Sequence, residues 1–420
     1  MIRGLFAVGF FLQVLIAPGG RLAGAQPAPE VLKLGQLVAI KDVCAWPKLV
    51  VTPGGELVAA LYNQSVHGVR PGDVDVYAST DGGVTWSKRG TATRHAKDSA
   101  RFNHALGVTP AGELLLVSGG WGYDPQPNEK APWHKKKLLR PTTSRSTDGG
   151  RTWSISSQFP DGKDGMTLVP FGNVVCGVDG TLRVAAYSFN PQANPREDIC
   201  YTAMSQDNGS TWTLGSIVGQ PAANETDIVR LRDGRWLAAA RNLGRPGGHK
   251  ANTDIYASDD DAKTWRLLGT PTHEGQHPAD LMQLADGRVV LTVGDRNGQF
   301  GVSVLLSADR GATWSAPKQI ARTLSGDSGY PSTAQLKDGS LVTVFYAAKS
   351  AEYGGYHMGA VRWRLPIRNE GVFHRASNSD RQKPSRRASA DGGTGAPTSP
   401  ERKRRRCRRR PCCRGAASQS

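Results

Sequence analysis

An eight-residue motif, Ser-x-Asp-x-Gly-x-Thr-Trp, occurs five times in this chain and constrains its fold more than any other feature. The copies occupy residues 79–86, 146–153, 205–212, 258–265 and 307–314, and the fourth has Ala262 in place of the glycine. In this motif the Asp accepts hydrogen bonds from the backbone of its own turn, Gly supplies a positive φ, and Trp buries a large side chain. Each copy, called an Asp-box turn below, therefore predicts a hairpin.

The five aspartates of these turns are open to a catalytic or a structural interpretation. A carboxylate that bonds to the backbone of its own turn is already occupied, which makes it a poor catalyst. We therefore assign Asp81, Asp148, Asp207, Asp260 and Asp309 to folding.

A second repeat, a strand followed by a Gly-containing turn and another strand, occurs six times. Its turn glycines are Gly55, Gly112, Gly180, Gly234, Gly287 and Gly339. Each interval between them accommodates four short strands, which is typical of one propeller blade. The two repeats together predict an all-β fold, a six-bladed β-propeller over residues 44–365, preceded by a lead-in at 26–43 and closed by the segment 356–365. The longest interval leaves room for a loop at 120–141, which either rims a binding face or is a plain excursion.

The N-terminal segment predicts export. Arg3 precedes an apolar run from Leu5 to Ala17, and small residues end at Ala25, the pattern of a signal peptide over residues 1–25. A membrane anchor is the alternative, but Pro18 interrupts the run before it reaches the roughly 18 apolar residues that a span needs. No later stretch is long and apolar enough for a membrane span, so we expect a secreted or periplasmic protein.

The C-terminal segment 366–420 carries most of the formal net charge of +17 and almost no aliphatic residues, which predicts a disordered basic tail. Such a tail is either an electrostatic anchor for acidic surfaces or nucleic acid, or a solvated extension, and export favours the second. The small basic excess of the remaining chain fits an anionic substrate, and we expect no nucleic-acid partner.

The cysteines carry little information. Cys176 and Cys200 form the one pair outside the tail that we consider for a disulfide, because each lies near a predicted strand of one repeat. The sequence contains neither the CxxC spacing nor the His/Cys cluster of a zinc site, and we expect no cofactor.

Five Asp-box turns on a six-blade pattern over residues 40–365 resemble the sialidase superfamily, including its bacterial BNR-repeat members. The resemblance implies a retaining glycosidase with three arginines that hold the substrate carboxylate, a Tyr nucleophile polarised by a Glu, and an Asp that acts as acid and base. A phenol suits this chemistry because the anomeric carbon of a sialic acid bears a carboxylate, which repels an anionic nucleophile.

The resemblance assigns the family's binding and nucleophilic roles to four residues. Glu225 and Arg241 flank the hairpin NETDIVRLRDGRWLAAARN and match the family's Glu and second Arg, while Arg296 matches the third Arg. Tyr330 opens the last inner hairpin and matches the nucleophile. The structural alternatives are a solvated carboxylate for Glu225, ordinary ion pairs for the two arginines, and a Tyr packed by Pro331.

The first blade departs from the family pattern, because Ala45-Trp46-Pro47 stands where an Arg-Ile-Pro signature is expected. Without the first arginine, the group of residues that holds the substrate carboxylate loses one charge-assisted hydrogen bond, worth about 1.5–3 kcal/mol. Lys48 and Arg101 are two candidates to replace this arginine. The alternative interpretation is that both are ordinary surface charges.

Asp73 is the candidate acid/base and Asp75 the reserve, since both precede the first Asp-box turn, and the alternative for Asp73 is a turn cap. His67, His277 and Asp280 are further residues that can line the cavity.

Three functions follow from these assignments. The first is an exo-α-sialidase-type hydrolase that acts on an acidic glycan. The second is a hydrolase or lyase for another acidic sugar such as a uronate, and the third is a non-catalytic glycan-binding propeller.

Overall fold

The computed structural model describes residues 26–125, 134–156, 159–190, 197–243 and 251–366, and all regular elements in them are β-strands. The chain divides into two units, Met1–Ile367 and Arg368–Ser420, and all described residues belong to the first. The expected signal peptide and nearly all of the expected basic tail lie outside the described residues.

The described residues form six four-stranded antiparallel units, and the sixth takes its last strand from the N-terminal end of the described chain. The first holds β2 (Cys44–Val51), β3 (Leu57–Tyr62), β4 (Val74–Ser79) and β5 (Ser87–Thr93); the second β6 (Ser99–Val108), β7 (Leu114–Tyr123), β9 (Thr142–Ser146) and β10 (Ser154–Ser156); the third β11 (Leu168–Cys176), β12 (Leu182–Ser188), β13 (Cys200–Ser205) and β14 (Thr213–Gly219). The fourth holds β15 (Ala223–Arg230), β16 (Trp236–Asn242), β17 (Asn252–Ser258) and β18 (Arg266–Gly269); the fifth β19 (Gln276–Gln283), β20 (Val289–Asp295), β21 (Gly301–Ser307) and β22 (Lys318–Arg322). The sixth holds β23 (Ser328–Gln335), β24 (Leu341–Ala347), β25 (His357–Arg364) and β1 (Leu32–Lys41).

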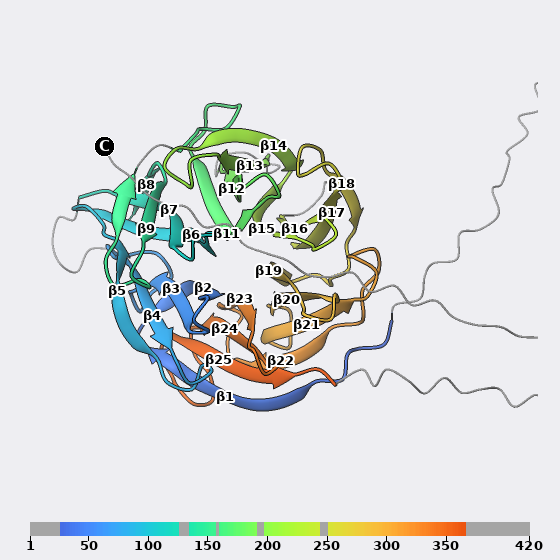
Figure 1. The fold of residues 1–420 in the computed structure, drawn as a ribbon. Coiled ribbons are helices and arrows are strands. Elements are labelled where there is room, and N and C mark those ends of the chain that lie inside the picture. The colour runs from blue at the N-terminus through green and yellow to red at the C-terminus, as the bar shows by residue number, and fades with distance from the viewer. Residues whose placement is uncertain (1–25, 126–133, 157–158, 191–196, 244–250, 367–420) are drawn as a thin grey trace, which may run out of the picture. The chain divides into compact units, whose positions relative to one another are not determined.

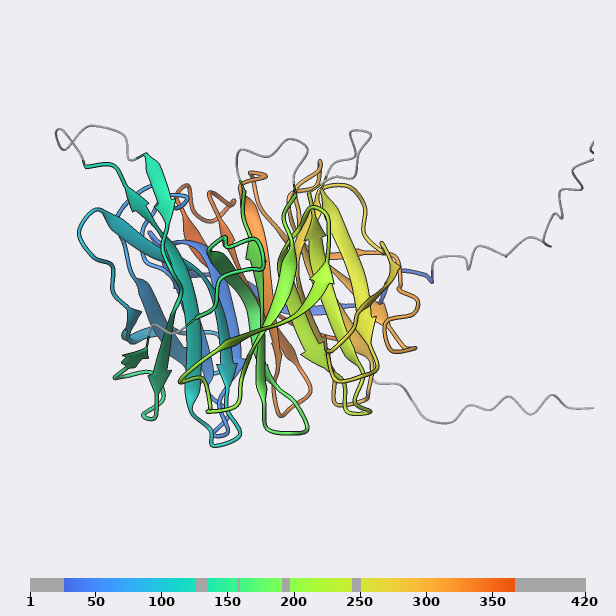
Figure 2. The ribbon, with the colours of Figure 1, turned by 90° about the horizontal axis from the view of Figure 1, so that it is seen from above.

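The units stand around a common axis, as in a β-propeller (Figure 1). A short parallel pairing between β6 and β11 joins the second and third units into one nine-stranded sheet. Seen from the side, the connections between strands gather at the two ends of the strands (Figure 2). The all-β fold class with repeated four-stranded sheets is therefore confirmed.

The N-terminal strand closes the ring, which differs from the expected boundary at residue 44. β1 pairs antiparallel with β25 from Leu32 opposite Arg364 to Lys41 opposite His357. The segment 356–365 therefore supplies the third strand of the sixth unit, and the expected lead-in supplies the fourth. Because these two strands come from opposite ends of the chain, no turn joins them, which explains why six units have only five Asp-box turns.

The Asp-box turns have the predicted hydrogen bonds. In the first copy, Asp81 accepts bonds from the N–H of Thr85 at 2.9 Å and from its hydroxyl at 2.6 Å. The Thr in each of the other four copies makes the same two bonds. The bonds from Thr85 hold the pKa of Asp81 well below its usual range, and those from Thr211 lower that of Asp207 to about 2. The structural role of these aspartates is confirmed.

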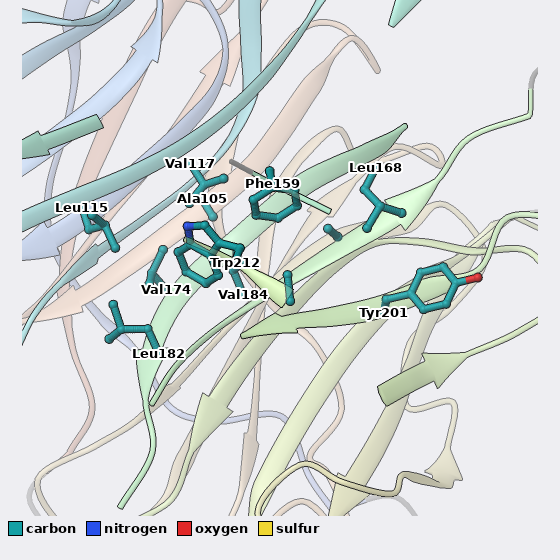
Figure 3. Close-up of a cluster of buried hydrophobic side chains, with 12 residues drawn as sticks. Ala105, Leu115, Val117, Phe159, Leu168, Val174, Leu182, Val184, Tyr201 and Trp212 are labelled. Atoms are coloured by element: carbon teal, nitrogen blue, oxygen red, sulfur yellow. The ribbon is translucent and has the colours of Figure 1, made fainter. Parts of the chain in front are cut away.

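The hydrophobic core lies between neighbouring units. Figure 3 shows one cluster, formed by β6, β7 and the strands of the third unit around Trp212 of the third Asp-box turn. Trp212 packs 5.7 Å from Phe159, and its indole N–H donates to the hydroxyl of Thr143 in β9 of the second unit at 2.9 Å. This Trp therefore fastens its own unit to the preceding one.

Buried carboxylates also link the innermost strands. Asp227 in β15 accepts bonds from the backbone N–H groups of Asn173 in β11 and Leu281 in β19, both at 2.7 Å. In the next unit, Asp280 in β19 accepts a bond from the N–H of Thr333 in β23 at 2.9 Å. These bonds satisfy backbone groups that water cannot reach and tie each unit to its neighbour.

Lys48 is buried between the units, which corrects the expectation of a surface charge. Its side chain is 1% exposed, and its ammonium lies 3.8 Å from Asp280 and over the ring of Phe171. Burial and the charge of Asp227 raise the pKa of Asp280 to about 7 although Lys48 lowers it. Lys48 and Asp280 therefore belong to the structural core.

Two further expectations differ from the structure. Cys176 and Cys200 are free thiols, because they lie at opposite ends of β12, against Leu182 and Tyr187 respectively. The segment 120–141 is only partly a loop, since β7 continues to Tyr123 and pairs with β8 (Lys135–Leu138), while residues 126–133 lie outside the described residues.

Candidate functional site

Backbone bulges at corresponding ends of the innermost strands place the candidate residues. The register of β15 shifts between Ala223 and Thr226, and that of β23 between Gly329 and Ser332, so Glu225 and Tyr330 stand in bulges. Tyr330 has a φ of 50°, an uncommon conformation for a bulky residue. Such bulges re-aim side chains next to functional sites.

Two more innermost strands repeat this device. The register of β2 shifts between Cys44 and Lys48, and that of β19 between Gln276 and Ala279. These shifts place Trp46, with a φ of 64°, and His277 in bulges of their own. The innermost strands of the other two units also shift register, β6 between Phe102 and His104 and β11 between Phe171 and Val175, so all six innermost strands carry a bulge.

Tyr330, Glu225 and Arg241 form a continuous chain of hydrogen bonds. The hydroxyl of Tyr330 donates to Glu225 Oε1 at 2.5 Å, and Arg241 Nη1 donates to Glu225 Oε2 at 2.6 Å. Tyr330 is 4% exposed, and the side chains of Glu225 and Arg241 are 6% and 20% exposed. The structure therefore brings together three residues that lie up to 105 positions apart in the chain.

Burial, together with the Glu225 carboxylate, keeps the phenol of Tyr330 protonated. Burial and the Glu225 carboxylate raise the pKa of Tyr330 above its ordinary value, although Arg241 and Arg296 lower it. For Arg241, burial lowers the pKa, but Glu225 and Tyr330 outweigh it and the pKa rises. The cluster thus contains a neutral phenol beside a carboxylate that accepts its hydrogen.

Arg296 packs on the ring of Tyr330, with its guanidinium carbon 5.1 Å from the ring centroid. Its Nε donates to the carbonyl of Ser328 at 3.0 Å, and its Nη2 donates to the hydroxyl of Tyr346 at 3.2 Å. Arg296 is therefore close to Tyr330, and its guanidinium pairs with neutral acceptors.

His277 lies in the field of the two arginines. Burial, Arg241 and Arg296 lower its pKa to about 2, so the imidazole is neutral. Its Nδ1 is buried and has no hydrogen-bond partner among the described residues, as is also true of Nε of Arg241 and Nε1 of Trp46. These buried polar atoms lack the hydrogen-bond partner that buried polar groups usually have.

A second polar cluster adjoins the first. Asp327 Oδ1 lies 2.7 Å from Nδ1 of His67 and accepts a bond from the hydroxyl of Tyr346, also at 2.7 Å. The hydroxyl of Tyr356 donates to the other carboxylate oxygen. His67, predicted as a cavity residue, thus belongs to this cluster, whereas sequence reasoning missed Asp327 and the two tyrosines. The one available signal was that Asp327 precedes Tyr330 in the segment DSGYPS.

The two candidate acids lie in other contacts. Asp73 Oδ1 is 2.6 Å from Nδ1 of His95 and accepts a bond from the N–H of the same residue. Asp75 is buried in β4, where its carboxylate pairs with Lys88 at 2.6 Å and accepts a bond from Thr91 at 2.7 Å. No contact in the described residues joins either Asp to Tyr330, so the acid/base role of Asp73 stays a prediction.

Arg101, considered as a substitute for the missing arginine, donates from Nη1 to the carbonyl of Arg140 at 3.0 Å. Within the described ranges, no contact brings it to Tyr330. In the same ranges, no group of three or more His, Cys, Asp and Glu side chains is placed to hold a metal ion. Nor do those residues form a helix that is long and apolar enough to cross a membrane.

Residues 72–343 match the family model of the BNR repeat-like domain. A sialidase of Paraclostridium sordellii is 27% identical over 219 residues, which cover 48% of this chain and 51% of that protein. A sialidase of Micromonospora viridifaciens is 24% identical over 400 residues, which cover 84% of this chain and 59% of that protein. The chain therefore spans about half to three fifths of the length of these relatives.

Solved structures show the same fold. A protein of unknown function from Dyadobacter fermentans superimposes with a TM-score of 0.65 at 21% identity, covering 80% of this chain and 99% of that one. A Trypanosoma rangeli sialidase in complex with the inhibitor DANA gives a TM-score of 0.54 at 17% identity, covering 80% of this chain and 58% of that one. The similarity to sialidases thus holds in sequence and in fold.

Proposed function

Because the chain belongs to the BNR repeat-like domain family, we propose that it is a glycoside hydrolase of the sialidase type that removes a terminal acidic sugar from glycans. The observation that carries this proposal is the hydrogen-bonded chain from Arg241 through Glu225 to Tyr330. The relatives that are named sialidases support the same substrate class.

The geometry supports a retaining mechanism with Tyr330 as the nucleophile. As the phenolic oxygen bonds to the anomeric carbon, its proton passes to Glu225 along the 2.5 Å hydrogen bond. The bond from the anomeric carbon to the leaving oxygen breaks, and that oxygen takes a proton from an acid. Water then attacks the glycosyl-tyrosine, and the phenol recovers its proton from Glu225.

Arg241, Arg296 and His277 supply the chemistry that binds an acidic sugar. The two guanidiniums are fixed by Glu225 and by the contacts of Arg296 with Ser328 and Tyr346. Two charges next to a buried phenol favour a substrate that carries a carboxylate at the reacting carbon. The neutral His277 adds a polar group that does not repel the sugar or compete for the anion.

Trp46 favours a second candidate within the same enzyme class. It occupies the inner-strand bulge of the first unit, and its ring lies 5.8 Å from that of Tyr330. This buried aromatic side chain lies in the segment where the resemblance leads one to expect an arginine, and the loss of that charge suits another acidic sugar such as a uronate, whose carboxylate is not on the reacting carbon. Export to the cell exterior or periplasm remains part of the proposal, since glycan substrates are found there.

The test is hydrolysis of 4-methylumbelliferyl glycosides of sialic acid and of glucuronic acid by the full chain and its Tyr330→Phe variant. We expect release from one of the two substrates and a fall of at least about 10³-fold in kcat for the variant. Tyr353→Phe is the matched control, because Tyr353 also donates to a carboxylate, Asp42, but outside this cluster. Normal turnover by Tyr330→Phe would refute the mechanism, and binding of both sugars without hydrolysis would favour a glycan-binding protein.

A further inference from the structure

We propose that His67, held by Asp327, is the acid that protonates the leaving oxygen in the glycoside cleavage described above. This inference rests on the proposed function and assigns to His67 the role that sequence reasoning gave to Asp73.

The contact between His67 and Asp327 fixes the tautomer of the imidazole. Partial burial raises the pKa of Asp327, but bonds from His67, Tyr346 and Tyr356 outweigh this and hold the pKa well below its usual range. An ionised carboxylate only accepts hydrogen bonds, so the hydrogen between Asp327 Oδ1 and His67 Nδ1 belongs to the imidazole. Nε2 is then the atom that exchanges a proton with a ligand, as in other carboxylate–histidine pairs.

His67 lies beside the proposed nucleophile, because the two rings share two neighbours. Trp46 packs edge-on against His67 at 5.1 Å and against Tyr330 at 5.8 Å between centroids. Tyr346 packs 5.8 Å from His67 and 5.7 Å from Tyr330. Glycosidases place the two reacting groups on either side of the scissile bond, and two rings that share Trp46 and Tyr346 as neighbours lie in the same part of the site.

Exposure separates the roles of the two residues. The side chain of His67 is 39% exposed and that of Asp327 33%, whereas Tyr330 is 4% exposed. Nε2 of His67 has no partner among the described residues. A sugar held on Tyr330 would therefore direct its leaving group, which is the rest of the glycan, toward the solvent side where His67 stands.

The loop that carries His67 is held in place by its own unit and by the second unit. The carbonyl of Gly68 accepts a bond from the hydroxyl of Tyr123 at 3.1 Å, and the carbonyl of Arg70 accepts one from Tyr62 at 2.5 Å. Gly68 has a φ of 60°, and a Cβ added there would lie 3.0 Å from the ring of Trp46. The position of His67 is thus preorganised, which is what a proton donor needs.

The groups around His67 connect it to the site of the substrate carboxylate. The carboxylate of Asp327, which contacts His67, accepts bonds from the hydroxyls of Tyr346 and Tyr356. Arg296 connects to this group because it donates a bond to the hydroxyl of Tyr346. Binding of the acidic sugar to Arg296 and protonation of its leaving group at His67 are therefore linked by one hydrogen-bonded chain.

Imidazolium Nε2–H gives its proton to the glycosidic oxygen while the bond from this oxygen to the anomeric carbon breaks and Tyr330 forms the new bond. In the second step the neutral Nε2 takes a proton from the attacking water, and the bond between the sugar and Tyr330 breaks. Each cycle returns His67 to its protonated form.

The test uses two substrates that share the sugar the enzyme accepts but differ in the leaving group. One is a 4-nitrophenyl glycoside, whose leaving group departs without protonation, and the other is an alkyl glycoside, whose leaving group needs an acid. For His67→Gln we expect kcat/KM on the alkyl glycoside to fall by about 10²–10⁴-fold and on the nitrophenyl glycoside by less than about tenfold. Asp327→Asn should show the same pattern to a smaller extent.

His95→Gln is the matched control, because His95 forms a similar contact with Asp73 and its side chain has a similar exposure of 35%. We expect the ratio of activities on the two substrates to be unchanged in this variant. Equal losses on both substrates for His67→Gln, or a leaving-group-dependent loss for Asp73→Asn instead, would overturn the role of His67 while leaving the hydrolase intact. Absence of turnover by the wild-type chain on either substrate would overturn the proposed function and this inference with it.

Discussion

Replacement of Glu225 by Gln tests the centre of the site, because this one side chain holds both the nucleophile and an arginine. The carboxylate accepts bonds from Tyr330 at 2.5 Å and from Arg241 at 2.6 Å, and it is 6% exposed. An amide has one acceptor oxygen, so Gln can keep only one of these two bonds in its present form. The other donor must turn away or meet the NH₂ group of the new residue.

The magnitude follows from these contacts. A hydrogen bond to a charged group contributes about 1.5–3 kcal/mol, and removal of one partner of a buried ion pair costs about 3–5 kcal/mol. Gln retains a neutral bond, and Arg241 keeps some contact with water because its side chain is 20% exposed. We therefore expect Glu225→Gln to lower the free energy of unfolding by about 2–4 kcal/mol, and kcat to fall by about 10²–10⁴-fold through loss of the base.

Urea denaturation followed by tryptophan fluorescence measures the loss of stability. The matched control is Glu113→Gln, since Glu113 pairs with Arg145 at 3.1 Å but is more exposed, at 21%. A more solvated pair contributes about 1 kcal/mol or less. The reasoning is refuted if Glu225→Gln destabilises the protein no more than Glu113→Gln, because the buried pair would then have no special weight.

Three further outcomes follow from the structure. Trp212→Ala should lower the free energy of unfolding by about 3–5 kcal/mol, since it opens a cavity between two units and removes a buried bond; thermal unfolding checks this, and a loss below about 1 kcal/mol contradicts it. Gly68→Ala should lower the free energy of unfolding by about 1–2 kcal/mol, because the residue has a positive φ and the new methyl group would meet the ring of Trp46. The same contact should displace His67 and slow hydrolysis of alkyl glycosides. Unchanged kinetics would show that the loop does not position the imidazole. The pKa of Asp280 is about 7 in the folded state, above the unfolded value of about 3.9. The protonated carboxyl group therefore stabilises the fold fully below about pH 4, and this stabilisation is lost as the pH rises toward 7. Urea unfolding should show a higher free energy of unfolding at pH 5 than at pH 8, and Asp280→Asn should reduce this difference.

Much of the fold could be predicted because its signals are local. In the Asp-box turns, the Asp bonds to a Thr four residues later. In the turns of the second repeat, the Gly has a φ between 78° and 95°. Both effects act within a single turn, so the local sequence predicts each hairpin. The closure of the ring could not be read in this way. The pairing of β1 with β25 joins the two ends of the described chain, and nothing in the local pattern of 32–41 indicates which strand it meets.

In the candidate site, too, the sequence indicated the positions of residues along the strands but not their contacts. Tyr330, Glu225 and Arg241 stand at the ends of inner hairpins and were assigned by resemblance to the family, and the structure joins them in one chain of hydrogen bonds. Asp73 was chosen for its place before the first Asp-box turn, yet its carboxylate bonds to His95 in the same unit. Position in the repeat therefore identifies which strand end a residue occupies, but not which neighbour its side chain meets.

The sequence by itself determined the all-β fold, the number of repeating hairpins and the structural role of the Asp-box aspartates, since these depend on short-range hydrogen bonds and backbone conformation. Only the tertiary structure decided that Lys48 is buried and that His67 pairs with Asp327, 260 positions away. The physical reason is that such contacts arise between different units, where the bulges of the inner strands and the closing strand set the distance between side chains.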